Sequence, residues 1–340
     1  MKVELAQDGR IWDEFVGYLA PDHLYYLWSW RDVIERTFGH QPYYLTAYSK
    51  GRVCGVLPLF SLRSRLFQRR LVSIPFCSHG GVLAETDEIR DKLLDAACKL
   101  ALQLGAQQIE LRQRERISIS WQDAPPKVTM EIQLNCNSDQ FWKRLSSGMR
   151  NKIRQGQKHG LRAEWGGLEK LSVFHSLFAI NMRNLGTPVY SLKFFENQIR
   201  RFPDRIRILT LWDKNDAVAA SFLTAHRDSL ELPWSASTVA SRKQYSHVLM
   251  YWIFIQQAIS EGFKSIDLGR CTPGSGTYEF KRHWNPVERR LHWYYWLAPG
   301  ASVSQLSPDN SKFKLAIEIW KRLPLAVANR LGPYVVRSIP

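Results

Sequence analysis

The residues best suited to chemistry lie at positions 266–284, where the sequence reads IDLGRCTPGSGTYEFKRHW. The glycines of its Pro-Gly-Ser-Gly segment let the backbone turn tightly and approach a ligand closely. Phe280 and Lys281 then place a cation beside an apolar wall. Acyl transfer to an amine passes through a tetrahedral oxyanion, and losing one group that stabilises it typically costs about 2.7–4 kcal/mol. Lys281 suits that role, while a lysine that caps a surface turn gives the same pattern. The candidate donor-binding residues of this stretch are Arg270, Gly274, Gly276, Thr277 and Tyr278.

A second cationic segment, SGMRNKIRQGQKHGL, occupies positions 147–161. Its first serine and last glycine are typical of the two ends of a helix. Arg150, Arg154 and Lys158 are four residues apart and share one face of that helix. Three cations on one face could hold phosphate oxygens. The same pattern also fits the solvated side of a surface helix.

A third candidate segment, PWSASTVASRKQYSHVLMYW, occupies positions 233–252. Trp234 ends a predicted strand that contains a proline. Arg242, Lys243 and Tyr245 come just before the N-terminus of a predicted helix, which is a favourable position for anions. We therefore include these four residues among the candidates for donor binding.

The candidate residues are positioned by elements that occur twice in the chain. Each half has, in order, a β-hairpin, a proline-containing strand, an amphipathic helix and a short strand. Proline cannot donate to a sheet ladder, so each proline marks an edge, a bulge or a splay. The paired segments are 43–62 and 206–226, 71–76 and 230–234, 93–106 and 247–263, and 109–113 and 266–270. We predict two copies of one α/β module, at about 1–135 and 136–300.

This order of elements resembles the GNAT acyltransferase fold, in which a central strand splays from its neighbour and the acyl donor lies in the gap. Two such modules in one chain resemble the FemAB aminoacyltransferases. The expected fold class is α/β (α+β), a tandem duplication of two GNAT-like domains, each a mixed, mostly antiparallel sheet flanked by helices. Phe280-Lys281 with Trp284 resembles the Phe-Lys signature of the second FemAB domain. The resemblance implies that Lys281 is catalytic at the reaction centre, that Phe280 is a wall of the site, and that Arg150, Arg154 and Lys158 lie on the helix that opens this domain.

The resemblance leaves the acyl donor open. GNAT enzymes that use acetyl-CoA usually carry an R/Q-x-x-G-x-G/A turn before the helix, and SRKQYSHVLM at 241–250 has no glycine. This favours aminoacyl-tRNA, with CoA held by side chains as the alternative. The long charged helical hairpin that some FemAB enzymes carry is also missing, which weakens the case for tRNA. We expect the donor to be a co-substrate, with no tightly bound cofactor and no metal.

Composition favours partners that carry phosphates. The 340 residues are enough for two domains, and 47 Lys and Arg against 31 Asp and Glu give a formal charge of +16. So basic a surface attracts nucleic acid, nucleotide-linked sugars or anionic lipid. The five scattered cysteines suggest neither a disulfide framework nor a zinc site. With no apolar leader and no membrane-spanning run, we expect a cytoplasmic location.

Residues 301–340 are predicted to form a helical tail that packs on the first module. We expect the first module to shape the acceptor side of the cleft. Basic and apolar residues also interleave there, as at a membrane surface. The tail and the segment 25–45, YYLWSWRDVIERTFGHQPYYL, look like FemAB-related proteins associated with exopolysaccharide and PEP-CTERM export systems. That resemblance implies a substrate from the cell envelope or from a polysaccharide pathway.

These features predict an N-acyltransferase that moves an aminoacyl group from aminoacyl-tRNA, or another acyl group, onto an amine of a cell-envelope or exopolysaccharide precursor. The expected acceptor is a lipid- or nucleotide-linked sugar. One alternative is a GNAT N-acyltransferase that depends on acyl-CoA. An alternative of another class is a non-catalytic protein that uses a basic cleft to bind a polysaccharide or another polyanion.

Overall fold

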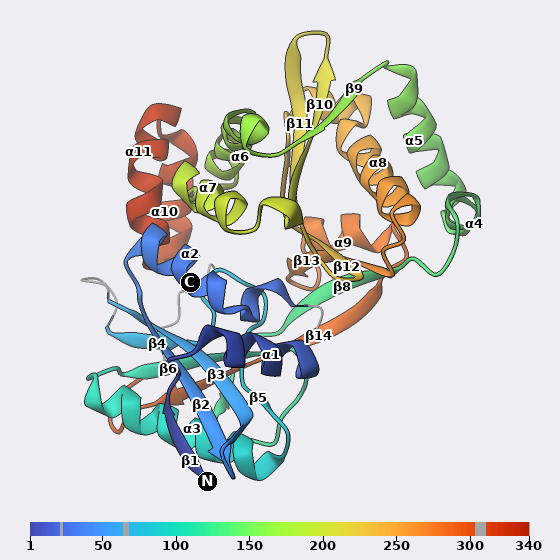
Figure 1. The fold of residues 1–340 in the computed structure, drawn as a ribbon. Helices are drawn as coiled ribbons and strands as arrows, with labels where there is room; N and C mark the ends of the chain where they lie inside the picture. The colour runs from blue at the N-terminus through green and yellow to red at the C-terminus, as the bar shows by residue number, and fades with distance from the viewer. Residues whose placement is uncertain (21–22, 64–67, 303–310, 340) are drawn as a thin grey trace. The chain divides into compact units, whose positions relative to one another are not determined.

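The computed structural model describes residues 1–20, 23–63, 68–302 and 311–339, and its chain forms two compact units (Figure 1). Unit 1 comprises Met1–Lys127, Arg290–Leu306 and Arg337–Pro340, and unit 2 comprises Val128–Arg289 and Ser307–Val336. The predicted modules at 1–135 and 136–300 are therefore close, but both boundaries move. Each boundary moves because the strand next to it pairs with a strand of the unit to which it now belongs.

The elements of unit 1 follow the predicted order. They are β1 (Lys2–Leu5), α1 (Gly9–Leu19), α2 (Trp28–Phe38), β2 (Gln41–Ser49), β3 (Arg52–Leu62), β4 (Arg70–Val72), β5 (Leu83–Ala84), α3 (Asp87–Gln103), β6 (Gln108–Gln113), β7 (Gln122–Asp123) and β14 (Val287–Leu297), of which the first three residues belong to unit 2. The sheet has the order β1-β2-β3-β4-β6-β14. Its only parallel neighbours among the described strands are β4 and β6.

Helices pack on both faces of the sheet of unit 1. Leu45 and Leu57 contribute to one core together with Leu93 of α3. Tyr44 and Phe60 point to the other face, where the ring of Tyr44 lies 4.6 Å from that of Trp12 in α1. This alternation follows from the pleat of a strand, which sends successive side chains to opposite faces.

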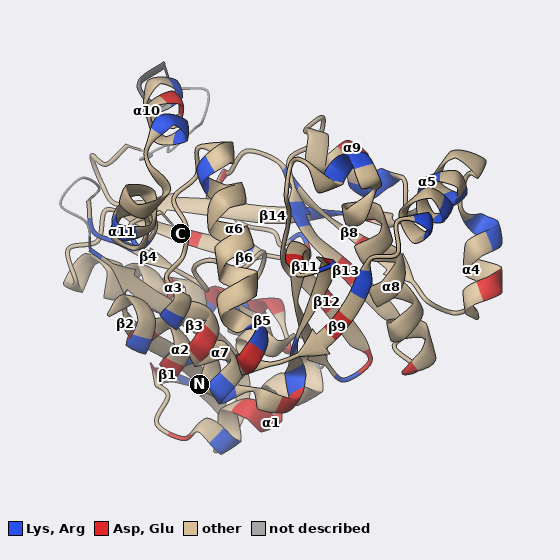
Figure 2. Ribbon diagram, turned by 90° about the horizontal axis from the view of Figure 1, so that it is seen from above, with Lys and Arg blue, Asp and Glu red and all other residues tan. Residues whose placement is uncertain are grey.

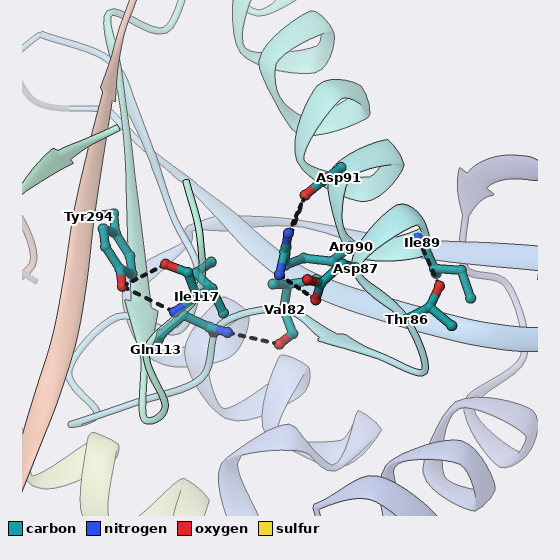
Figure 3. Close-up of polar contacts among 9 residues, drawn as sticks. All are labelled: Val82, Thr86, Asp87, Ile89, Arg90, Asp91, Gln113, Ile117 and Tyr294. Carbon is teal, nitrogen blue, oxygen red and sulfur yellow. Dashed lines mark hydrogen bonds and ion pairs between the residues drawn. The ribbon is translucent and has the colours of Figure 1, made fainter. Parts of the chain in front are cut away.

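Polar contacts fix the start of α3 and the end of the strand after it (Figure 3). The hydroxyl of Thr86 accepts a hydrogen bond of 3.3 Å from the amide of Ile89, so Thr86 caps the helix. Arg90 forms ion pairs with Asp87 at 2.6 Å and with Asp91 at 2.8 Å. At the end of β6, the Gln113 side chain donates to the carbonyl of Val82 at 3.1 Å. In the same figure, the hydroxyl of Tyr294 lies 3.3 Å from both the amide and the carbonyl of Ile117.

Unit 2 repeats the arrangement, with longer strands in its parallel pair. Its elements are β8 (Lys127–Gln133), α4 (Ser138–Arg144), α5 (Ser147–Lys158), β9 (Arg162–Gly166), α6 (Leu171–Leu185), α7 (Leu192–Arg201), β10 (Ile206–Asp213), β11 (Asp216–His226), β12 (Ser229–Ser237), α8 (Ser246–Ser260), β13 (Ser265–Cys271) and α9 (Gly276–Arg282), followed by α10 (Ser311–Arg322) and α11 (Leu325–Val336). The sheet order is β8-β13-β12-β11-β10-β9. The β12 and β13 pair is parallel, and the other pairs described in this sheet are antiparallel.

The two faces of this sheet are covered by α8 and α6 (Figure 1). Leu223 of β11 faces the core that includes Leu249 and Ile255 of α8. Its neighbour Phe222 points the other way, with its ring 5.5 Å from that of Phe174 in α6 and 5.6 Å from that of Trp234. Both faces are therefore apolar, which explains why the described strands of the hairpin show an almost continuous buried run.

The predicted tandem duplication is confirmed by the matching strand orders. The series β2-β3-β4-β6 of unit 1 and β10-β11-β12-β13 of unit 2 each join a hairpin to a parallel pair with one helix between its strands. One detail of the prediction is wrong. Pro75 does not interrupt a strand, because β4 ends at Val72, whereas Pro233 lies within β12.

The prediction that the tail packs on the first module is wrong for its two helices. Both α10 and α11 belong to unit 2, where they contact α6. Gly332 brings α11 close to the segment after α6, because a Cβ at that position would lie 2.9 Å from backbone atoms of Val189. Residues 303–310 and 340 of the predicted tail lie outside the described residues. Among the residues that are described, no helix has both the length and the apolar composition of a membrane span.

Candidate active site

The candidate site begins where two parallel strands separate. β12 pairs with β13 at three positions, from Ser229 with Ser265 to Glu231 with Asp267, and the ladder then ends. Next to this point the register between β11 and β12 shifts, with Pro233 on the side that has the extra residue. Proline has no N–H to donate, so the bulge sits where the ladder loses nothing by it. The prediction that this proline marks an edge, a bulge or a splay is confirmed, since the strand has a bulge at Pro233 and separates from β13.

A pocket of about 670 Å³ opens at the splay, and all of its lining belongs to unit 2. Such a volume is ordinary for a small-molecule site. The lining comes from three helices, both strands and the segment before α8: Phe178, Asn181, Met182 and Leu185 of α6; Leu232, Pro233, Trp234, Ser235, Ala236 and Ser237 of β12; Arg242, which precedes α8; His247, Met250 and Tyr251 of α8; Leu268 and Arg270 of β13; and Gly276, Thr277, Phe280 and Lys281 of α9.

Lys281 lines this pocket and is only 5% exposed. Its Nζ donates to the carbonyl of Gly269 at 2.7 Å and to that of Arg270 at 3.2 Å. An ammonium has three N–H donors. Its two bonds to described residues therefore leave one N–H for a ligand. Burial lowers the pKa of Lys281, because a charged amine loses solvation when it is buried. The structure thus fixes one cation at the base of the splay.

A bulge in β13 presents the carbonyl groups that hold this lysine. The register between β13 and β8 shifts between Asp267 and Arg270, where Gly269 has a φ of +77°. The Asp267 carboxylate accepts a bond of 2.7 Å from the Gly269 amide and another from the hydroxyl of Thr129. Only glycine adopts this backbone readily. The bulge, its glycine and the lysine therefore form one local structure.

Two other titratable groups of the pocket, His247 and Tyr251, are both uncharged near neutral pH. Burial lowers the pKa of His247 to about 4, with Arg242 and Lys152 adding to the shift, so the ring is neutral. Its Nδ1 has no hydrogen-bond partner among the described residues. Burial raises the pKa of Tyr251 to about 12, so its hydroxyl keeps the proton. The site therefore offers one neutral acceptor and one neutral donor beside the buried amine.

The structure places half of the predicted site residues in this pocket. Those that line it are Lys281, Phe280, Trp234, Arg242, Arg270, Gly276 and Thr277. Those outside its lining are Lys243, Tyr245, Gly274, Tyr278, Arg150, Arg154 and Lys158. Tyr245 instead adopts a left-handed backbone at the start of α8, and the hydroxyl of Tyr278 donates to Glu288 at 2.7 Å.

Of the three predicted cations of α5, Arg154 and Lys158 lie away from the buried residues of that helix, and Arg150 is half-buried. Met149, Ile153 and Gly156 are buried, and α5 contacts α8. Arg154 and Lys158 are exposed, and the guanidinium of Arg154 lies 5.4 Å from the ring centre of Trp142. Figure 2 shows the basic character of α5 and α9. Phosphate binding by α5 stays a prediction.

Sequence reasoning missed the wall that α6 contributes. Asn181, Met182 and Leu185 belong to no motif, and only their helical spacing with Phe178 marks them as one face. His247 was missed as well. Tyr251 is both buried and part of the pocket lining.

In unit 1 the chain after β4 stays hydrogen-bonded to β6, so these two strands do not separate as β12 and β13 do. β4 pairs with β6 from Arg70 to Val72, after which the chain remains bonded to β6. The Arg112 side chain, 1% exposed, donates to the carbonyl of Cys77 at 2.8 Å and pairs with Glu110 at 2.6 Å. The Gly80 amide donates to the Arg112 carbonyl at 2.9 Å.

Residues 143–282 match the model of the acetyltransferase (GNAT) domain, Acetyltransf_6. A search of curated protein sequences finds no match. Among solved structures, FemX aligns at a TM-score of 0.66 and 14% identity, covering 86% of this chain and 97% of its own.

Two further structures extend the likeness over both units. L-PGS from Bacillus licheniformis aligns at a TM-score of 0.54 and 12% identity, covering 94% of this chain and 99% of its own. A tandem GNAT protein from the clavulanic acid biosynthesis pathway aligns at 0.51 and 10%, covering 89% and 100%. At these identities the likeness concerns the fold. The chain is therefore a tandem pair of GNAT-like units, and the match to the acetyltransferase (GNAT) domain falls within unit 2, which holds the pocket.

Proposed function

We propose that this protein is an N-acyltransferase that works in the pocket of unit 2. It transfers an acyl or aminoacyl group from a phosphate-bearing donor to an amine of a cell-envelope or exopolysaccharide precursor. The observation that carries the proposal is the buried Lys281 at the base of the splayed strands, with one N–H left for a ligand. The match of residues 143–282 to the acetyltransferase domain supports the same reaction class.

In this proposal Lys281 stabilises the oxyanion. The acceptor nitrogen attacks the carbonyl carbon of the donor, a C–N bond forms, and the bond to the leaving oxygen or sulfur breaks. The nitrogen loses one proton and the leaving atom gains one, so the protons balance. The neutral ring of His247 accepts a hydrogen bond from the amine, and the protonated hydroxyl of Tyr251 donates toward the leaving atom. The transfer is direct and needs no covalent enzyme intermediate.

Cations at the pocket suit the phosphates of the donor. The Arg242 guanidinium is held by the Asn181 side-chain oxygen at 3.0 Å and by the Ser237 hydroxyl at 3.2 Å. A guanidinium held in this way is suited to phosphate oxygens. Both acyl-CoA and aminoacyl-tRNA carry such groups. We place the reaction in the cytoplasm, with a lipid- or nucleotide-linked sugar as acceptor and with the C-terminal helices at the membrane surface.

Titration calorimetry with acetyl-CoA and longer acyl-CoAs tests the donor, and a transfer assay with a panel of amino sugars tests the reaction. We expect micromolar donor binding, and a turnover that Lys281→Ala lowers by about 10²–10³ with binding retained. If no CoA ester binds, charged tRNA becomes the donor to assay. Salt-sensitive polyanion binding without transfer from either donor, unchanged by Lys281→Ala, would make the protein a non-catalytic binder.

A further inference from the structure

One face of α6 gives the pocket an apolar wall. Phe178, Asn181, Met182 and Leu185 all line the pocket and have the spacing of a single helical face. Phe178 is 2% exposed, whereas Leu185 is 58% exposed. Three apolar side chains therefore lead from the core to the solvent along this wall. Asn181 is occupied by its hydrogen bond with Arg242.

The other walls add further apolar surface and only positive charge. Leu232, Trp234, Met250, Leu268 and Phe280 contribute apolar groups from the strands, α8 and α9. Charged groups enter as Arg242, Arg270 and Lys281. Among the described residues that line the pocket there is no aspartate and no glutamate.

This distribution of charge disfavours an ammonium group in the pocket. An ammonium there would meet cations, and like charges that lie close together in a partly desolvated site repel one another. Glu231 and Asp267 lie on the two strands where their pairing ends, yet neither lines the pocket. The carboxylate of Asp267 already accepts bonds from Thr129 and from the amide of Gly269.

We propose that the transferred acyl group is an uncharged hydrocarbon chain longer than acetyl. Its carbonyl lies at Lys281, its chain lies along Phe178, Met182 and Leu185, and the phosphates of its carrier lie toward Arg242. This inference rests on the proposed function and narrows its substrate class from aminoacyl groups to apolar acyl groups. The wall on α6 then selects the acyl chain, with Met182 at its middle.

Matched donors test the charge and the chain length separately. Octanoyl-CoA and 2-aminooctanoyl-CoA differ by one ammonium, and acetyl-CoA lacks the chain. The same three acyl groups, as stable amides of 3′-amino-3′-deoxyadenosine 5′-phosphate, mimic the end of a charged tRNA. On at least one of the two carriers, calorimetry should show the octanoyl compound binding at least tenfold more tightly than both the amino and the acetyl compounds. A fully buried methylene strengthens binding by about fourfold.

Two variants at Met182 make the test specific to this wall. Met182→Glu adds a carboxylate, and it should weaken octanoyl binding and bring the amino compound to equal or tighter binding. Met182→Gln has a similar size without charge and should keep the preference for the uncharged chain. Circular dichroism spectra of both variants, compared with that of the wild type, serve as the control for folding.

Three outcomes overturn the inference: no binding of any of the six compounds, equal or tighter binding of the amino compound by the wild type, or equal binding of acetyl and octanoyl groups. The proposed function fails separately, if octanoyl donors bind with the expected preference and no amine is acylated.

Discussion

The buried Lys281 ammonium loses its proton at a lower pH than an exposed lysine does, because burial removes the solvation of its charge. Burial lowers the pKa of Lys281 from its ordinary value of 10.5. If the ammonium stabilises the oxyanion, kcat/KM of the wild type should fall as the pH rises through this lowered pKa. In Lys281→Arg the guanidinium stays charged, so we expect a lower rate without the alkaline decline. The measurement is the pH profile of kcat/KM for both proteins.

Two checks accompany this profile. Donor affinity measured at the same pH values separates binding from the chemical step. A rate that rises as Lys281 loses its proton would assign the amine as a base instead of an oxyanion-binding cation. The same alkaline decline in both proteins would show that another group is responsible.

Two neighbouring cations give a matched comparison of donor binding. Both side chains are exposed. Arg242 lines the pocket and is held by Asn181, whereas Lys243 lies outside the lining. Arg242→Ala should weaken donor binding by about tenfold or more, because a hydrogen bond to a charged group is worth about 1.5–3 kcal/mol. Lys243→Ala should change it less than about twofold, as expected of an exposed charge. Equal effects in calorimetry would place the phosphates outside the pocket.

Single residues of the site differ in how well the sequence predicts them. Lys281 and Phe280 form a local pattern after a glycine-rich turn, so they could be found. Asn181 and Met182 lie about a hundred positions earlier, and only the packing of α6 over β12 brings them to the same pocket. Nothing in the local sequence around them indicates a ligand.

At the scale of elements, the bulge in β13 couples backbone geometry to Lys281. A Cβ on Gly269 would lie 3.0 Å from the Leu232 carbonyl oxygen, and its φ is +77°. Gly262, just after α8, has a φ of +80° and open space around it. Gly262→Ala should cost about 1–2 kcal/mol of unfolding free energy through backbone strain alone. Gly269→Ala should cost more and should also lower turnover, because the carbonyl that holds Lys281 moves.

Urea unfolding and the transfer assay measure the two effects together. Turnover per folded molecule is the decisive quantity, and Gly262→Ala controls for the loss of a left-handed glycine. If both variants keep full turnover, the bulge has no part in positioning the lysine.

Elements were predicted well where two signals agreed. In the sequence each hairpin has alternating apolar residues on both sides of a turn, and each helix has apolar residues at helical spacing with a glycine at its C-terminal end, Gly105 and Gly262. The proline signal was weaker because one residue fits two structures. Pro233 marks a bulge within β12, while Pro75 follows the end of β4. Which of these occurs depends on the neighbouring strand, and that is a tertiary property.

At the scale of the whole molecule, the boundaries depended on pairings between distant segments. β8 joins unit 2 through β13, more than a hundred residues later, and most of β14 returns to unit 1 beside β6. The tail helices likewise pack against α6, which is distant in the sequence. Sequence periodicity shows which face of an element is buried, and it does not show against what.

The two tail helices leave an apolar surface exposed. On α10 and α11 the side chains of Leu315, Ile319, Leu331 and Tyr334 are between 45% and 71% exposed. Exposed cations accompany them, and the whole chain has a formal charge of +16. Apolar groups beside cations suit an anionic lipid surface. We therefore expect the protein to sediment with vesicles that contain phosphatidylglycerol, less so at higher salt, and not with vesicles of phosphatidylcholine alone.

Two exposed tyrosines provide the variant and its control. Tyr334 is 71% exposed on α11, and Tyr18 is 76% exposed on α1 of unit 1. Tyr334→Glu should reduce vesicle binding severalfold, because it replaces an apolar contact by a charge that anionic lipid repels. Tyr18→Glu makes the same change in net charge and should have little effect. Equal losses would mean that binding follows net charge alone, and equal binding to neutral vesicles would remove the electrostatic part of the argument.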